Sequence, residues 1–296
     1  MERLGLMSNL NVKCYNYDNA PKRVKALIGK LINALKSILG ENLIGVYLHG
    51  SLVMGGFVPG QSDVDVMVVA ENALSDQQKE SLAKSCLSLS KEIDGKGLEM
   101  SVILRTYAEH PVYPMPFEFH YSETWRSIFE SGQIGPFPKG DPDLSAHLRV
   151  ISERGITLFG KPINKVFGSI SDKDYLKALR YDLEDILESL MSDPVYYILN
   201  LCRIMAFIKT RKVMSKKEGG EWYLANEKSF KKLVKQALKC YLLNLKPDFD
   251  SDELKEFAKY ALQKLDVASK QVLTNDLDYD EVKRDIERHG VIAGRN

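Results

Sequence analysis

Closely spaced cysteines are absent from this sequence. Its four cysteines, Cys14, Cys86, Cys202 and Cys240, are scattered without a C-x-x-C pair or a neighbouring histidine. That distribution argues against a zinc knuckle and against a disulfide framework. An excess of one charge is also missing, because 41 Lys and Arg are balanced by 40 Asp and Glu. Coating nucleic acid is therefore disfavoured as the main task, although a local basic patch remains compatible.

Long apolar runs are missing as well. No apolar stretch follows the charges at the start of the chain, and the most apolar later segment, 196–208, is interrupted by Arg203. We therefore expect no membrane span, and a cytoplasmic protein with reduced thiols. With 44% apolar and 27% charged residues, the composition is that of a folded globular protein. Its 296 residues fit one large or two modest domains.

The first hundred residues alternate between helical and strand periods. Apolar residues recur three and four apart over 22–39, which predicts an amphipathic helix ended by a glycine. Short apolar runs at 43–48 and 64–69, and an alternating run at 98–104, predict strands. These elements predict a small mixed sheet with helices between its strands.

Two further segments of the first half differ in character. Ser75, with Gln78 three residues on, has the form of a capping box that opens a helix to about residue 93. Residues 107–142 are rich in proline, glycine and aromatic residues without clear periodicity. We expect this second segment to be irregular.

The sequence after about residue 167 is dominated by helix signals. Helix starts are expected at Ser171, Asp193, Asn226 and Asp250, each a residue type that favours an N-cap. This predicts an all-helical bundle. The expected division is an N-terminal domain at 1–166 and a C-terminal helical domain at 167–296.

The most informative motif is Gly50-Ser51 followed, after eleven residues, by Asp63-Val-Asp65. Side chains two apart on a strand share a face, so the two carboxylates project together. At that spacing they can hold Mg²⁺, which favours a few carboxylates together with phosphate oxygens. Each half of the motif is common on surfaces, but their combination in one strand–loop–strand order is more specific.

Gly50 and Ser51 supply the other half of the motif. A glycine that ends a strand allows close backbone approach, and the following N–H groups with the Ser51 hydroxyl can bind phosphate oxygens. Phosphate donors beside metal-binding carboxylates indicate a nucleoside-triphosphate site. Metal-assisted displacement at phosphorus is the chemistry that suits it.

The residues from His49 to Asp65 resemble the signature of the nucleotidyltransferase superfamily, which includes DNA polymerase beta and the antibiotic nucleotidyltransferases. Within it they are most similar to the streptomycin/spectinomycin adenylyltransferases, which share the Gly-Gly and the Ser before the first acid. Residues 141–160 and 203–216 are similar to further segments of that family. The resemblance implies a polymerase-beta-like catalytic domain at 1–166 and a helical substrate-binding domain at 167–296.

The resemblance also implies roles for individual acids. Asp63 and Asp65 match magnesium ligands, and Ser51, after Gly50, matches a triphosphate contact. Glu99 matches the third acid, both a metal ligand and the general base that takes a proton from the acceptor hydroxyl. On the predicted strand at 98–104, Glu99 lies on the face opposite Met100, but without the family a solvated strand glutamate would be the favoured interpretation.

Positive charge and acceptor contacts are implied on the helical domain. Arg203 and Lys216 match family residues that meet the nucleotide phosphates, and Asp193 matches an acid that contacts the drug. Trp125 approximately matches a family tryptophan near the acceptor, although packing is an equally good explanation for it. Ser189 replaces a further acid of streptomycin-modifying members, which favours spectinomycin over streptomycin.

Other residues receive structural interpretations. The acidic run from Asp182 to Asp193 is interpreted as a solvated helix face for every member except Asp193. His49 and His147 lie in no nucleophile or ligand spacing, so we expect both to be structural.

The sequence thus predicts an aminoglycoside O-nucleotidyltransferase that transfers AMP from MgATP to a hydroxyl of a small polycationic antibiotic. Two alternatives stay open. The same chemistry could modify another acceptor, such as a different antibiotic, a protein or an RNA end, or the chain could be a catalytically silent nucleotide-binding protein. The oligomeric state is not predicted.

Overall fold

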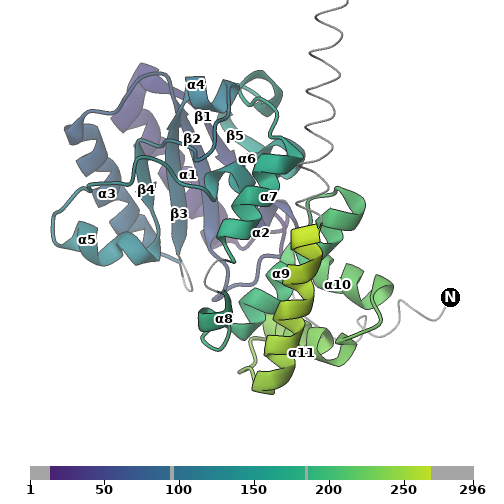
Figure 1. Ribbon diagram of the computed structural model, residues 1–296. Helices are drawn as coiled ribbons and strands as arrows, with labels where there is room; N and C mark the ends of the chain where they lie inside the picture. The colour runs from purple at the N-terminus through teal and green to yellow at the C-terminus, as the bar shows by residue number, and fades with distance from the viewer. Residues whose placement is uncertain (1–13, 94–96, 184–185, 268–296) are drawn as a thin grey trace, which may run out of the picture.

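The computed structural model describes residues 14–93, 97–183 and 186–267, and its sheet occupies the N-terminal half (Figure 1). Five strands lie in the order β4-β3-β2-β1-β5, with β2 and β3 parallel and the other pairs antiparallel. The sheet is therefore mixed, as expected. The strands are β1 (Leu43–Leu48), β2 (Val64–Ala70), β3 (Leu98–Leu104), β4 (Phe119–Tyr121) and β5 (Ile156–Gly160).

One face of the sheet is covered by α1 (Lys22–Leu39) and α3 (Asp76–Ser90). Val64, Val66 and Val68 of β2 are fully buried against this layer. The predicted amphipathic helix is confirmed as α1. The predicted capping box is confirmed as well, because the Ser75 hydroxyl accepts the Gln78 N–H and the Gln78 side chain accepts the Ser75 N–H.

The opposite face carries the alternate residues of the same strands. Met67 and Val69 of β2 pack there with α6 (Leu144–Arg154) and α7 (Asp172–Tyr181). That hydrophobic cluster continues without interruption into the helices that follow residue 167. Asp65 and Glu99, the second residues of β2 and β3, also lie on this second face. Because side chains alternate between the two faces of a strand, these acids face α6 and α7 while their neighbours face α1 and α3.

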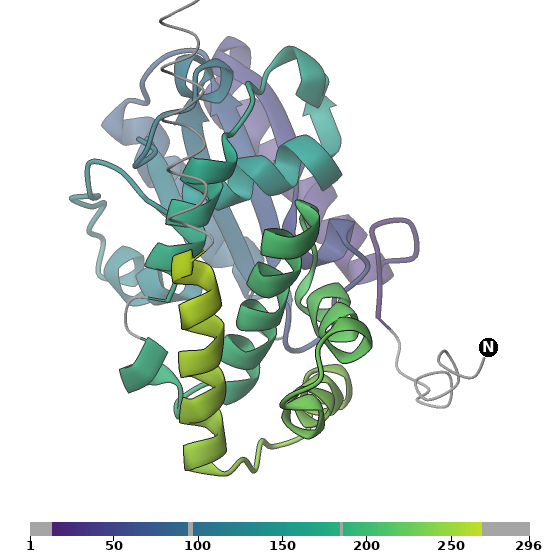
Figure 2. The same cartoon turned by 45° about the vertical axis from the view of Figure 1, so that its right-hand side comes forward.

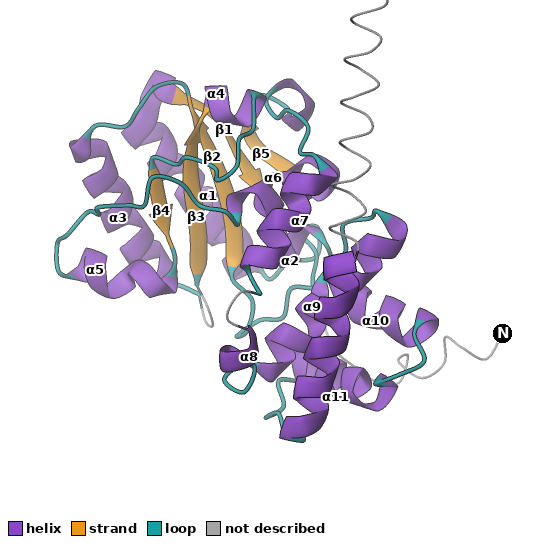
Figure 3. Cartoon of the chain, viewed as in Figure 1, coloured by secondary structure: helices purple, strands orange, loops and turns teal. Residues whose placement is uncertain are grey.

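Every regular element of the described chain beyond η3 (Ile163–Lys165) is a helix (Figure 3). They are α7, α8 (Ile186–Ser189), α9 (Pro194–Thr210), α10 (Lys216–Asn226), α11 (Lys231–Leu243) and a last helix over 251–267, yellow in Figure 2. No helix in the described ranges is long and apolar enough to cross a membrane.

Several elements differ from the sequence expectation. The segment expected to be irregular contains two short helices, α4 (Arg105–Glu109) and α5 (Arg126–Glu130), and the edge strand β4. Helix α10 ends at Asn226, where a helix was expected to begin. A Ser215–Glu218 capping box opens α10, so a local signal for this helix was present in the sequence.

Candidate functional site

The parallel register of β2 and β3 brings two of the predicted acids side by side. Asp65 is the direct partner of Glu99, and both project from the sheet face that packs against α6 and α7. Asp63 stands just before β2. Each of the three residues has a carboxylate oxygen within 4.8 Å of the other two. Oxygen ligands at this spacing fit a hard divalent cation.

Gly50 lies in close contact with one of these acids, Asp65. Its φ of +68° lies in the left-handed region, and a Cβ at this position would overlap the Asp65 carboxylate. Only glycine therefore permits the chain to turn from β1 into α2 (Gly50–Val53) so close to the acid. The next side chain, Ser51, has a buried hydroxyl without a hydrogen-bond partner among the described residues. A polar oxygen atom of a ligand would satisfy it.

Burial makes two of these acids, Asp65 and Glu99, hard to ionise without a cation. The pKa of Asp65 is raised well above its usual value by burial and by the nearby charges of Asp63 and Glu99. Burial raises the pKa of Glu99 to about 7, with His147 opposing the shift and Asp63 adding to it. The cluster thus favours either protons or a bound cation.

His147, on α6, lies among these carboxylates. Its Nε2 is 3.0 Å from Asp143 Oδ2 and 4.0 Å from Glu99 Oε1. Burial alone would lower the pKa of His147, but Asp143, Glu99 and Asp65 raise it well above its usual value. In return, His147 holds the pKa of the partly buried Asp143 below its usual range. His147 thus supplies a positive charge next to Glu99, and Asp143 stabilises that charge.

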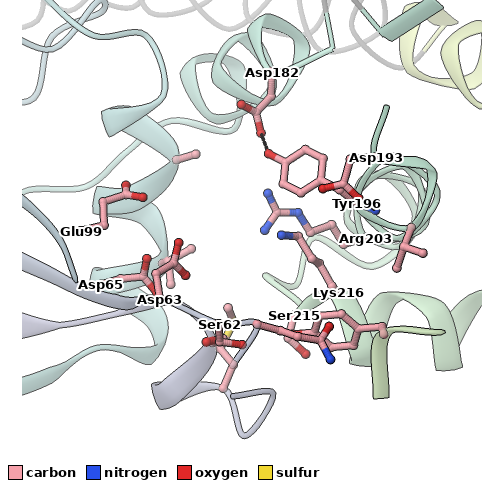
Figure 4. Close-up of a pocket in the computed structure, with 18 of the residues that line it drawn as sticks. Ser62, Asp63, Asp65, Glu99, Asp182, Asp193, Tyr196, Arg203, Ser215 and Lys216 are labelled. Atoms are coloured by element: carbon pink, nitrogen blue, oxygen red, sulfur yellow. Dashed lines mark hydrogen bonds between the residues drawn. The ribbon is translucent and has the colours of Figure 1, made fainter. Parts of the chain in front are cut away.

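Two cationic side chains approach from the helices. Arg203 comes from the middle of α9 and Lys216 from the first turn of α10, and their charged ends point toward the carboxylates (Figure 4). The Arg203 Nε is buried and has no hydrogen-bond partner in the described part of the chain. Gly219 lets α10 pack directly on α9, because a Cβ there would lie 2.6 Å from the Arg203 Cα.

A cavity of about 580 Å³ joins the two sides. The acids of the sheet line one wall, and Arg203 and Lys216 line the facing wall together with Asp182 and Asp193 (Figure 4). This volume lies in the range of small-molecule and cofactor sites. An anion held by the cations would sit opposite a metal held by the acids, which is the arrangement that a nucleotide triphosphate requires.

Two family models match the chain in the regions that build these walls. The model described as a nucleotidyltransferase domain matches residues 28–127, and the model described as the aminoglycoside adenylyltransferase C-terminal domain matches residues 165–264. A spectinomycin 9-adenylyltransferase of Staphylococcus aureus is 33% identical over 195 residues, which cover 64% of this chain and 74% of the relative. The chain belongs to the aminoglycoside adenylyltransferase family.

Two further relatives match a larger part of this chain. A spectinomycin 9-adenylyltransferase of Campylobacter jejuni is 26% identical over 249 residues, or 83% of this chain and 94% of the relative. The crystal structure of a spectinomycin adenyltransferase from Enterococcus faecalis, solved with ATP and spectinomycin, matches with a TM-score of 0.71 and 24% identity. The match covers 82% of this chain and 99% of that one. The expected fold class is confirmed.

The structure brings most of the predicted site residues together. The cavity of this adenylyltransferase is lined by eight of the nine, namely Gly50, Ser51, Asp63, Asp65, Glu99, Asp193, Arg203 and Lys216. Trp125 does not line it. Its ring packs on Phe129 and Phe137, at centroid distances of 6.0 and 5.0 Å, as part of the cluster on the other face of the sheet. This arrangement agrees with the packing alternative for Trp125.

The cavity is also lined by charged and polar residues that the sequence analysis did not select, among them Asp143, His147, Asp182 and Tyr196. Asp143 is the N-cap residue of α6 and His147 lies four residues further on in that helix, which was not predicted, so their pairing was not visible. Asp182 is half-buried rather than solvated, and the Tyr196 hydroxyl donates to its Oδ2 at 3.2 Å. A tyrosine two residues after the Asp193–Pro194 helix start was the available signal for this contact.

Proposed function

We propose that this enzyme transfers AMP from MgATP to a hydroxyl of an aminoglycoside antibiotic, with spectinomycin favoured over streptomycin. The carrying observation is the single cavity in which the Asp63–Asp65–Glu99 triad faces Arg203 and Lys216. The acceptor is inferred from the relatives, which are named for spectinomycin. Ser189, in place of an acid of streptomycin-modifying members, supports the preference.

The acid triad would hold Mg²⁺. The oxygen spacing fits the ion, and the raised pKa values of Asp65 and Glu99 indicate that these carboxylates need a positive partner when ionised. When bound, Mg²⁺ neutralises phosphate charge and polarises the phosphorus centre. In this proposal Asp63 and Asp65 act only as metal ligands, whereas Glu99 is both a metal ligand and the general base.

The Glu99 carboxylate is the proposed general base. It takes the proton of the acceptor hydroxyl as that oxygen forms a bond to the α-phosphorus and the bond to the bridging oxygen of pyrophosphate breaks. Without a cation the pKa of Glu99 is about 7, and Mg²⁺ at the triad would favour the ionised carboxylate, which is the form that accepts a proton. Arg203 and Lys216 provide fixed positive charge for the departing pyrophosphate, and Ser51 with Gly50 binds phosphate oxygens.

Asp193 is the proposed acceptor contact, and its geometry leaves room for the role. One carboxylate oxygen, Oδ1, accepts the Tyr196 N–H and caps helix α9. The cap fixes the carboxylate at the cavity wall, where a negative charge attracts a polycationic acceptor. We also infer a catalytic domain at 1–166 and a helical substrate-binding domain at 167–296, with the reaction in the cavity between them.

The direct test is to incubate the protein with MgATP and a panel of aminoglycosides and to measure product masses. An AMP adduct on spectinomycin, together with released pyrophosphate, is the expected result. An adduct on streptomycin alone would contradict the preference, and strong RNA binding that falls steeply with salt would favour an RNA acceptor instead. Pyrophosphate release without any adduct would also contradict the acceptor assignment.

Variants test the metal assignment in the same assay. Asp63→Ala and Asp65→Ala should abolish transfer, because each removes a charge that holds the metal, while circular dichroism stays that of the folded protein. Asp76→Ala is the matched control, since this acid stands in the first turn of α3, remote from the cavity lining. Turnover near that of the wild type in either triad variant would eliminate the assignment.

A further inference from the structure

Tyr196 makes two chemically different contacts in the cavity wall, one through its hydroxyl to Asp182 and one through its ring to Lys216. Its hydroxyl donates to Asp182 Oδ2 at 3.2 Å, and Asp182 stands at the C-terminal end of α7. The Lys216 Nζ lies 4.1 Å from the centroid of its ring. These three residues come from three separate elements, α7, α9 and α10, and all three line the cavity (Figure 4).

The backbone of Tyr196 is fixed where these contacts are made. It lies in the first turn of α9, and its N–H donates to the Asp193 carboxylate that caps the helix. The ring of Tyr197 also packs against its ring in an edge-on arrangement, at 5.2 Å between centroids. Tyr196 therefore presents its ring and its hydroxyl from a rigid point.

We propose that Tyr196 is a positioning residue that serves both substrates: its ring directs the Lys216 ammonium toward the nucleotide phosphates, and its hydroxyl directs the Asp182 carboxylate toward an ammonium group of the acceptor. The inference rests on the proposed function and adds to it two residues, Tyr196 and Asp182. It also specifies the chemistry that Asp182 recognises, which is a charged amine.

The lysine half of the proposal follows from flexibility and charge. A lysine has a long, flexible stem, so holding its ammonium in one place costs side-chain entropy. The face of an aromatic ring attracts an ammonium within about 6 Å without neutralising it, whereas a carboxylate in the same place would neutralise the charge. The ring thus orders Lys216 and preserves its charge for phosphate oxygens.

The Asp182 half follows from burial. Removal from water raises the pKa of this carboxyl to about 6, and the Tyr196 hydroxyl acts in the opposite direction by favouring the ionised form. A carboxylate in such a place gains more from a cationic ligand than an exposed one does, because less water competes for it. The tyrosine hydroxyl occupies Oδ2, which fixes the plane of the group.

Two substitutions at Tyr196 separate the halves. Tyr196→Phe keeps the ring and removes the hydroxyl, so the KM for the acceptor should rise about 2- to 10-fold while the parameters for ATP stay within about twofold. Tyr196→Leu removes the ring as well, so kcat/KM for ATP should also fall by about 2- to 30-fold. Tyr181→Phe, at a tyrosine that is 46% exposed on α7, is the matched control and should leave all parameters unchanged.

Double-mutant cycles distinguish positioning from a general structural role. If the ring acts through Lys216, the effects of Tyr196→Leu and Lys216→Ala on kcat/KM for ATP are less than additive. If the hydroxyl acts through Asp182, Tyr196→Phe and Asp182→Asn are less than additive on the acceptor KM. Thermal unfolding of every variant checks the fold, and the second cycle remains decisive if Tyr196→Leu is unstable.

Additive effects in either cycle would overturn the corresponding half of the proposal. The same holds if Tyr196→Phe changes the ATP parameters as strongly as Tyr196→Leu does. A wild-type protein that forms no adduct with any aminoglycoside would contradict the proposed function instead, so the two failures are separable.

Discussion

At the scale of single residues, the site brings together carboxylates that repel one another when ionised. Asp63, Asp65 and Glu99 have oxygens within 4.8 Å, and the pKa values of Asp65 and Glu99 are raised. Groups arranged in this way destabilise the metal-free fold whenever they are ionised, because burial and like charge both favour the neutral form. We infer that the triad trades stability for function.

Glu99→Gln should make the metal-free protein more stable at alkaline pH. The pKa of Glu99 rises from an ordinary 4.5 to about 7 on folding. Its contribution to stability is therefore complete below pH 4.5 and is lost as the pH rises through 7. The full shift corresponds to about 3 kcal/mol, and the 26% exposure of the side chain reduces the expected gain of the variant to about 1–3 kcal/mol at pH 8.

The measurement is urea unfolding of both proteins at pH 4.5 and pH 8 in the presence of a chelator. Activity should move the other way, since loss of a general base slows transfer by about a hundredfold or more. A stability difference that is the same at both pH values would contradict the raised pKa, and an unchanged rate would remove Glu99 from the proposed chemistry.

At the scale of elements, strand register and one tight turn assemble the acidic wall. Asp65 and Glu99 are far apart in the sequence and become neighbours only because β2 and β3 pair in parallel with these residues opposite each other. Gly50, at the start of α2, then brings the Ser51 hydroxyl to the same place. Small changes in this turn should therefore act on the metal ligands.

Gly50→Ala should abolish most of the transfer activity. The substitution adds the strain of a left-handed backbone, about 1–2 kcal/mol, and also forces the Asp65 carboxylate to move. Gly55→Ala is the matched control, because Gly55 has a φ of +69° but has nothing within 4 Å of its added Cβ.

Both variants should lose similar stability from backbone strain, and only Gly50→Ala should lose Mg²⁺-dependent activity. The comparison requires thermal unfolding and the adduct assay for each protein. Equal activity in the two variants would contradict the close approach of Gly50 to Asp65.

At the scale of the whole molecule, the two halves share their packing. One hydrophobic cluster includes Met67 of the sheet and Ile198 of α9, so it crosses the expected division at residue 166. Polar contacts cross the division as well. The Tyr241 hydroxyl donates to the Gly56 carbonyl at 2.8 Å, and Arg154 pairs with Glu218 at 3.1 Å. The cavity walls are therefore fixed relative to each other by direct packing.

This shared packing predicts that the two halves unfold together. The chain has two tryptophans, Trp125 against the cluster on one face of the sheet and Trp222 against the cluster that continues into the helices. In Trp125→Phe and in Trp222→Phe, fluorescence of the remaining tryptophan and far-ultraviolet circular dichroism should give the same urea midpoint. A fluorescence transition that precedes the dichroism transition in either variant would contradict a common unfolding unit.

The sequence determined by itself the features that depend on near neighbours. The period of α1, the alternation in β2 and β3, the Ser75 capping box and the Asp63-Val-Asp65 pattern all lie within a few residues, where propensity and side-chain period act directly. The Gly50-to-Asp65 motif also predicted the family, because its order of residues is specific.

Tertiary structure alone decided which distant residues meet. Sequence gave no register for β2 and β3, no reason for His147 to face Glu99, and no sign that Trp125 would pack on the far side of the sheet. Contacts such as those among Asp182, Tyr196 and Lys216 join three helices, and their formation depends on how the whole chain buries its apolar surface. No local pattern encodes these contacts. The residues of the two walls, and a site between the two halves, could therefore be named in advance, whereas the side-chain contacts that join the walls could not.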